Sequence, residues 1–158
     1  MRHGRNPPDK PDFGLLPYTI VVPIPAVGTT PADVVVPTGE IWRMESVGTQ
    51  CTNAAVVASR YFFLDILADG VNITHEYASN QAIPTTVTAR FHCSTQTISK
   101  LSTSAASAVA GGVSGVILGE RAIIRIGYNA MNAGDQFTAS TVRYFKWKDY
   151  EFKGHEWS

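Results

Sequence analysis

Apolar and polar residues alternate along much of this 158-residue chain, and a period of two is typical of β-strands. Between residues 40 and 50, Trp42 and Met44 share one face, which is expected to form the core. Residues 57–67 alternate as well, but both of their faces are fairly apolar, which predicts a central strand covered on each side. The other strands are expected at residues 18–22, 33–36, 71–77, 86–93, 113–118, 121–128 and 136–150.

Turn signals separate these strands. Asp69-Gly70 predicts a tight turn between strands 57–67 and 71–77, and Asn132–Asp135 predicts the turn before the last strand. About eight strands with irregular spacing indicate an all-β fold, an antiparallel β-sandwich of the jelly-roll type. In the last strand one register is expected to contain Phe137, Ala139, Thr141, Arg143, Phe145 and Trp147.

The stretch 94–112 has no comparable pattern and is dominated by Ser, Thr and Ala. Such a composition is typical of a long loop. A short helix at 102–110 is the alternative, because alanine favours helices.

The two ends of the chain differ from its centre. Residues 1–17 contain four prolines, which exclude helix and central strand, and predict an extended N-terminal arm before a sandwich domain at 18–147. Residues 148–158 form a C-terminal arm, in a tail whose aromatic and cationic residues alternate; a protein interface is favoured there over stacking on nucleic acid. The expected partner-binding residues are Arg5, Pro7, Pro8, Phe13, Trp147, Tyr150, Phe152 and Trp157.

Charge narrows the classes of partner. Charged residues make up only 16% of the chain, which favours a surface largely covered by neighbouring subunits. The 13 basic and 13 acidic residues cancel, so neither nucleic acid nor a membrane is an expected partner. The first residues lack the apolar segment of a signal peptide, which predicts synthesis in the cytosol. Cys51 and Cys93 are then expected to be thiols, with a single disulfide as the alternative.

Residues for catalysis or ligand binding are scattered. The four histidines do not cluster, and His92 and Cys93 should point to opposite faces of one strand, so no metal or cofactor site is expected. Among the carboxylates, Asp69 is expected to be a structural residue of the predicted turn. The side chain of Asp65 is expected to face Arg60 or Arg43. The sequence therefore predicts a protein that is not an enzyme.

Three segments carry a resemblance to a known family: Pro37-x-Gly39-x-x-Trp42-Arg43-Met44, the strand from Arg60 to Gly70, and the strand from Arg121 to Tyr128. Together they resemble the jelly-roll decoration, or cement, proteins of tailed bacteriophages. The resemblance implies a virion structural protein made in the host cytoplasm. It would bind the outside of the assembled shell, with the major capsid protein and copies of itself as partners, commonly as a trimer.

A carbohydrate- or receptor-binding module of a phage tail or fibre is the alternative function. Sugar sites on β-sandwiches combine exposed aromatic rings with amide or carboxylate groups. The candidate residues are Tyr77, Asn80 and Gln81, or Tyr128 and Asn129.

Overall fold

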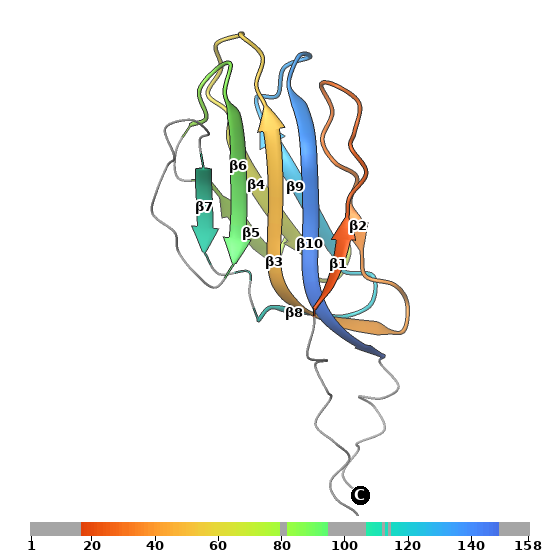
Figure 1. The fold of residues 1–158 in the computed structure, drawn as a ribbon. Coiled ribbons are helices and arrows are strands. Elements are labelled where there is room, and N and C mark those ends of the chain that lie inside the picture. Colours follow the sequence, from red (N-terminus) through yellow and green to blue (C-terminus); the bar gives the residue numbers. More distant parts are fainter. Residues whose placement is uncertain (1–16, 80–81, 95–106, 112, 114, 149–158) are drawn as a thin grey trace, which may run out of the picture.

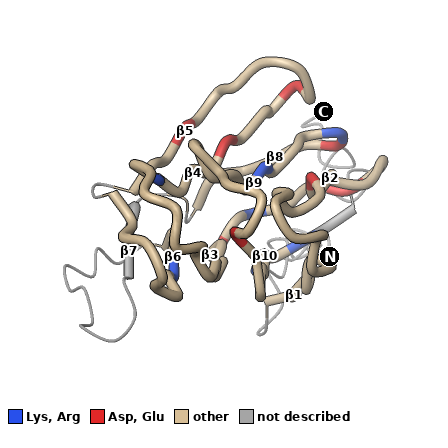
Figure 2. Tube along the Cα trace, turned by 90° about the horizontal axis from the view of Figure 1, so that it is seen from above, with Lys and Arg blue, Asp and Glu red and all other residues tan. Residues whose placement is uncertain are grey.

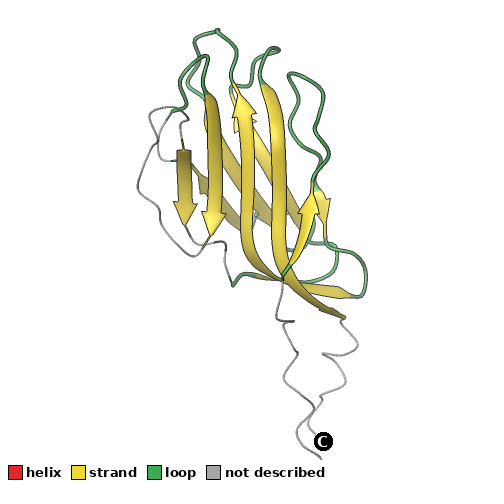
Figure 3. Ribbon diagram, in the orientation of Figure 1, coloured by secondary structure: helices red, strands yellow, loops and turns green. Residues whose placement is uncertain are grey.

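The protein is a β-sandwich in which two sheets pack face to face (Figures 1 and 3). The structure, a computed structural model, describes residues 17–79, 82–94, 107–111, 113 and 115–148, and these contain no helix. Its strands are β1 (Tyr18–Val21), β2 (Val34–Val35), β3 (Glu40–Thr52), β4 (Tyr61–Leu67), β5 (His75–Ala78), β6 (Thr88–Ser94), β7 (Ser107–Gly111), β8 (Ile117–Leu118), β9 (Ile123–Asn129) and β10 (Gln136–Lys148).

One sheet has the order β1-β10-β3-β6-β7, with β8 paired to the first part of β3, and the other has the order β2-β9-β4-β5. Neighbouring strands are antiparallel except β6 and β7, which run parallel. The expected all-β sandwich is therefore confirmed. The first and last strands are adjacent, since Tyr18 in β1 is the partner of Tyr144 in β10.

The alternation of residues predicts the core well in the first part of β3 and in β4. Trp42 and Met44 of β3 are buried, as expected for the face assigned to the core. In β4 the inward face is fully buried, and β4 lies between β9 and β5. Its inward side chains are Phe62, Leu64 and Ile66, which pack with Ala89, Phe91 and Cys93 of β6.

The outward face of β4 is covered only in part, because Tyr61 and Phe63 are half-buried. The ring of Phe63 lies over Gly127 of β9, its cross-strand partner. A Cβ at Gly127 would come within 1.8 Å of the Phe63 ring, so any larger residue there would force the ring to move.

The prediction that every second residue from Phe137 to Trp147 lies on the same face of β10 is wrong. The pairing of β10 with β3 shifts between Phe137 and Ala139, so Thr138 is an extra residue and the inward face changes parity. Phe137 is buried, but beyond the bulge the buried residues are Ser140, Val142 and Tyr144. A bulge cannot be seen in the sequence because alternation continues on both sides of it.

The weak stretch 94–112 contains a strand that the sequence did not predict. β7 pairs in parallel with β6, from Ser107 opposite Arg90 to Gly111 opposite Ser94. This pairing contradicts a helix over 107–110. Backbone pairing with β6 identifies β7 as a strand, whereas its own sequence shows no alternation of apolar and polar residues.

The Asp69 turn is confirmed as a turn, but it is wider than a two-residue hairpin. Oδ1 of Asp69 accepts hydrogen bonds from the backbone N–H groups of Val71 and Asn72, and Oδ2 accepts one from the Asn72 side chain. These bonds lower the pKa of Asp69 to about 2, those from Asn72 contributing most. The returning strand β5 therefore begins only at His75.

Candidate functional site: the loop apex

Four connections gather at one end of the sandwich, at the top of Figure 1. We call them the loop apex. Within the segments given next there is no Asp, Glu, Lys, Arg or His and no aromatic residue, although three of the four connections end at a charged residue, Asp33, Arg60 or Asp135. The four segments are residues 22–32, 53–59, 82–87 and 130–134.

The loop apex exposes aliphatic side chains. In the first segment Ile24 and Val27 are 66% and 57% exposed, and in the second Val56 and Val57 are 54% and 89% exposed. Met131 is half-buried beside the core. Figure 2 views the molecule from above and shows charged residues as isolated short segments in a mostly tan trace. The surface of the four segments is therefore uncharged, with aliphatic side chains beside exposed hydroxyl groups such as those of Thr29, Thr30 and Thr86.

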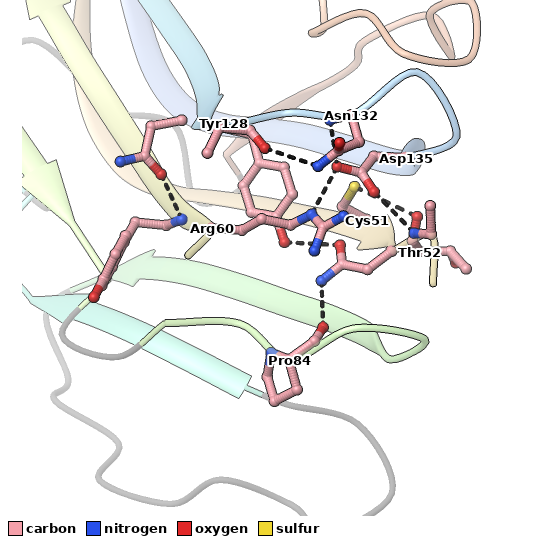
Figure 4. Close-up of polar contacts among 12 residues, drawn as sticks. Cys51, Thr52, Arg60, Pro84, Tyr128, Asn132 and Asp135 are labelled. Carbon is pink, nitrogen blue, oxygen red and sulfur yellow. Dashed lines mark hydrogen bonds and ion pairs between the residues drawn. The ribbon is translucent and has the colours of Figure 1, made fainter. Parts of the chain in front are cut away.

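Beneath the apex, Asp135 connects three of the four segments (Figure 4). Its Oδ1 accepts the backbone N–H of Ala54 at 2.8 Å, and its Oδ2 accepts that of Asn132 at 2.8 Å. Its own carbonyl oxygen accepts the N–H of Gly28 at 2.8 Å. One buried residue thus fixes the loops 22–32, 53–59 and 130–134 relative to one another.

Arg60 is the counter-ion of Asp135. Its Nε donates to Oδ2 of Asp135 over 2.8 Å, and neither side chain has any exposed surface. The Nη1 and Nη2 groups of Arg60 are also buried, and they have no hydrogen-bond partner among the described residues. The ion pair therefore lies in a low-dielectric interior, where losing one partner is costly.

Asn53 joins the fourth segment to this network. Its side-chain nitrogen donates to the carbonyl oxygen of Pro84 at 2.7 Å, and its backbone N–H donates to the carbonyl oxygen of Val87 at 3.1 Å. Its Oδ1 accepts the hydroxyl of Tyr128 at 2.7 Å. The ring of Tyr128 lies 4.6 Å from that of Phe62, so the polar network rests directly on the aromatic core.

The ionisation of these groups follows from burial and hydrogen bonding. Burial opposes ionisation of Asp135, but hydrogen bonds from Arg60, Asn132 and Ala54 outweigh it and lower the pKa of that carboxyl. Burial, and then the charge of Asp135, raises the pKa of the Cys51 thiol to about 12. Burial likewise raises the pKa of Tyr128. At neutral pH the network therefore holds one charged pair beside a neutral thiol and a neutral phenol.

This arrangement suits adhesion. Loops that are already ordered lose little conformational entropy on binding, and exposed aliphatic side chains gain by leaving water. The apex carries no acid, base or nucleophilic thiol on its surface. Its exposed aliphatic side chains are suited to contact with another surface.

The structure leaves most of the expected partner-binding residues untested. Arg5, Pro7, Pro8, Phe13, Tyr150, Phe152 and Trp157 lie outside the described residues. Trp147 lies within β10, where its backbone pairs with Ile41 of β3. The described strands begin at Tyr18 and end at Lys148, at the end of the sandwich opposite the apex (Figure 1).

One of the two candidate sugar sites is wrong. Tyr128 is buried and bonded to Asn53, and Oδ1 of Asn129 accepts the backbone N–H of Tyr61. In the other, Tyr77 is half-buried against the core, while Asn80 and Gln81 lie outside the described residues.

The expected partners of Asp65 are also wrong. Arg60 pairs with Asp135, whereas Asp65 lies opposite Glu76 of β5 and Arg125 of β9. Arg125 in turn forms a two-pronged ion pair with Asp33, at 3.0 and 2.8 Å. Burial and then the charge of Glu76 raise the pKa of Asp65, and Arg125 opposes this rise.

Cys51 and Cys93 are both buried and are not joined in a disulfide, so that alternative is not realised. His92 is exposed and Cys93 buried, which confirms that they point to opposite faces. Among the described residues, no three His, Cys, Asp or Glu side chains are placed to hold a metal ion. None of the described segments forms a helix of the length and hydropathy needed to cross a membrane.

Comparisons with protein-family models, curated proteins and solved structures find no match to this chain.

The sequence did not reveal the apex because its key residues looked ordinary. Asp135 ends an Asn-Ala-Gly-Asp turn signal, and Arg60 precedes an apolar strand. The available signal was the absence of charge in all four loop segments, which becomes meaningful once the fold brings them together.

Proposed function

We propose that the protein is a non-catalytic structural component of a phage virion, a capsid decoration protein that binds the outside of the assembled shell and stabilises it. The observation that carries this proposal is the loop apex, an ordered, uncharged surface with exposed aliphatic side chains at one end of a rigid sandwich. Exposed aliphatic side chains gathered on the loops at one end of a domain are typical of interaction sites. A subunit that works inside an assembly would keep such a surface covered.

We also infer that the sandwich is a jelly roll. Strands β1-β10-β3-β6 in one sheet face β2-β9-β4-β5 in the other, and the first and last strands lie side by side. This order supports two interleaved Greek keys of four antiparallel strands each. The parallel strand β7 is then an addition at one edge.

The mechanism would be adhesion from both ends of the sandwich. The apex would supply one contact surface and the expected arms at residues 1–17 and 148–158 the other, since the described strands begin at Tyr18 and end at Lys148 opposite the apex. Many identical contacts on one particle act together, so weak individual contacts still give firm attachment. Partners would be the major capsid protein and copies of this chain.

Purified protein should co-sediment with expanded, empty capsids and raise the temperature at which they are disrupted. A matched control is the same protein with both arms removed, after its folding has been checked by circular dichroism. Failure to bind any capsid form would contradict the proposal. Specific binding in a glycan screen would instead favour a receptor-binding module.

A further inference from the structure

We propose that the two outer faces of the sandwich are complementary docking surfaces, through which the basic face of one copy stacks on the acidic face of the next. The outer face of a sheet is the side turned away from the other sheet. The basic face belongs to the sheet β1-β10-β3-β6-β7, and the acidic face to the sheet β2-β9-β4-β5. This contact goes beyond the proposed function, because it uses surfaces other than the loop apex and forms without capsids.

The outer face of the first sheet carries an excess of positive charge. Arg43, Arg90 and Arg143 each lie between two buried neighbours in their strands, so their side chains point away from the core. Glu45 is the one carboxylate among the described residues of this face, and it forms an ion pair with Arg143 at 3.3 Å. Three cations therefore stand against one anion.

The outer face of the second sheet carries the opposite charge. Asp65 points away from the core, since both of its neighbours in β4 are buried on the inward face. Its cross-strand partners are Glu76 of β5 and Arg125 of β9. Arg125 is already held by the Asp33 carboxylate at 3.0 and 2.8 Å. On this face three carboxylates therefore share one cation.

Each face has an exposed charge without a counter-ion among the described residues. Glu76 is exposed and belongs to none of the ion pairs, and Oδ1 of Asp65, opposite it, has no hydrogen-bond partner. Two carboxylates directly opposite each other repel, so a cation from outside would be favourable there. Arg90 is exposed, and its Nε donates to the neutral side chain of Gln50 at 2.9 Å. Arg90 is therefore the cation that we assign to Glu76 of the next copy.

A second copy supplies both sides of this contact. Opposite charges attract and orient the two surfaces, whereas stacking two basic or two acidic faces would bring like charges together. Exposed aliphatic side chains lie on both faces and would be covered as well. They are Val21 and Ile117 on the basic face and Val35 on the acidic face.

Stacking of unlike faces has a consequence for the assembly. Figure 2 shows β4 and β5 in one layer and β6 in the other, so each copy has one face of each sign on opposite sides. Contact between two different patches continues into rings or filaments and does not stop at a pair. The loop apex lies at the end of the strands, away from both faces, and stays accessible (Figure 1).

The first test is the mass of the full chain by analytical ultracentrifugation over a concentration series. At low salt the average mass should rise with concentration past that of a pair, 2 × 17.1 = 34.2 kDa. At high salt it should fall back toward 17.1 kDa, because salt screens attraction between surface charges. A chain that is monomeric at low salt, or that associates equally well at high salt, would overturn the proposal.

The second test is a charge swap. Arg90→Glu and Glu76→Lys should each weaken association by at least about tenfold, because like charges would meet. The variant with both substitutions should associate again, as should an equimolar mixture of the two single variants, since the charges on the two sides are then exchanged.

Arg121→Glu is the matched control. Arg121 is exposed in the turn before β9, outside both faces, and its reversal changes the net charge as much as Arg90→Glu does. Association should be unchanged in this variant. A double variant that stays dissociated, or a control that loses as much association as Arg90→Glu, would contradict the contact.

Capsid binding separates this contact from the proposed function. If copies stack but bind no capsid, stacking stands and the decoration function fails. If the chain stays monomeric and Arg90→Glu lowers capsid binding, the basic face contacts the shell and stacking is wrong. Binding of a monomeric natural chain, but not of Arg90→Glu, to a single-stranded oligonucleotide would make a polyanion the partner of the basic face and would also overturn the proposal.

Discussion

Nε of Arg60 lies 2.8 Å from Oδ2 of Asp135, and neither side chain is exposed to solvent. The pair connects the start of β4 to the start of β10, residues that are 75 positions apart in the chain. Asp135 also accepts two backbone N–H groups, whereas Arg60 has no other side-chain partner among the described residues. The Arg60 side chain therefore depends on Asp135 for its hydrogen bonding, whereas Asp135 would keep two backbone hydrogen bonds without Arg60.

Replacing Asp135 with Asn should destabilise the protein by about 3–5 kcal/mol, because it leaves the Arg60 cation buried without a counter-ion. Arg60→Met should cost less, since Asp135 keeps the N–H groups of Ala54 and Asn132. Urea unfolding at neutral pH measures both. A larger loss for Arg60→Met would contradict this account of the network.

The same pair should make the protein sensitive to acid. The pKa of Asp135 is lowered in the folded state, so its stabilising effect is complete above the ordinary value of 3.8. This effect is lost as the pH falls below 3.8 toward the lowered folded-state pKa. The difference in unfolding free energy between the natural protein and Asp135→Asn should therefore shrink over that range. A difference that stays constant would show that Asp135 does not act through its charge.

Gly127→Ala should destabilise by about 1–3 kcal/mol, because the new methyl group would meet the ring of Phe63 and force it to move. Gly119→Ala is the matched control, since no atom lies within 4 Å of its added Cβ. Its unfolding free energy should stay within about 0.5 kcal/mol of that of the natural protein. Thermal unfolding compares the two variants directly. Equal effects would mean that the Phe63 ring does not constrain this position.

Asp65→Asn should stabilise the protein at neutral pH by up to about 1 kcal/mol, because Asp65 and Glu76 place two carboxylates directly opposite each other. The pKa of Asp65 is raised in the folded state, so ionisation of this group favours unfolding. The gain should vanish below pH 3.8, the ordinary pKa, where both states are protonated. Unfolding curves over a pH series test this, and a destabilised variant at neutral pH would refute it.

The Cys51 thiol should not react with a disulfide reagent in the folded protein. It is buried, and its pKa is raised to about 12, so almost no thiolate forms at neutral pH. Cys93 is also buried. Reaction with Ellman's reagent should reveal two thiols per chain in urea and far less than one without it. Rapid labelling of the folded protein would contradict this packing.

The sequence predicts the architecture where one strand's own side chains decide its structure. Trp42 and Met44 mark the buried face of β3, and Phe62 and Leu64 mark that of β4, because large apolar residues repeat at every second position. The same reasoning fails in β10, where the bulge at Thr138 changes parity, and in β7, which depends on pairing with β6.

The candidate site is less predictable because it depends on contacts between distant segments. Asp135 has the local sequence of a turn residue, and the turn is indeed there. Nothing near it in the chain indicates that Arg60 and Ala54 come within hydrogen-bond distance. The lack of charge in each apex loop is visible in the sequence, but its meaning depends on the fold that gathers the loops.

The pairing of β1 with β10 has a practical consequence for engineering. Tyr18 and Tyr144 are cross-strand partners, so a peptide fused before β1 and another fused after β10 would emerge from neighbouring strands. Both would leave the sandwich at the end away from the loop apex. If copies coat a particle, a pair of cargoes could be held side by side on each copy while the four loops remain unobstructed.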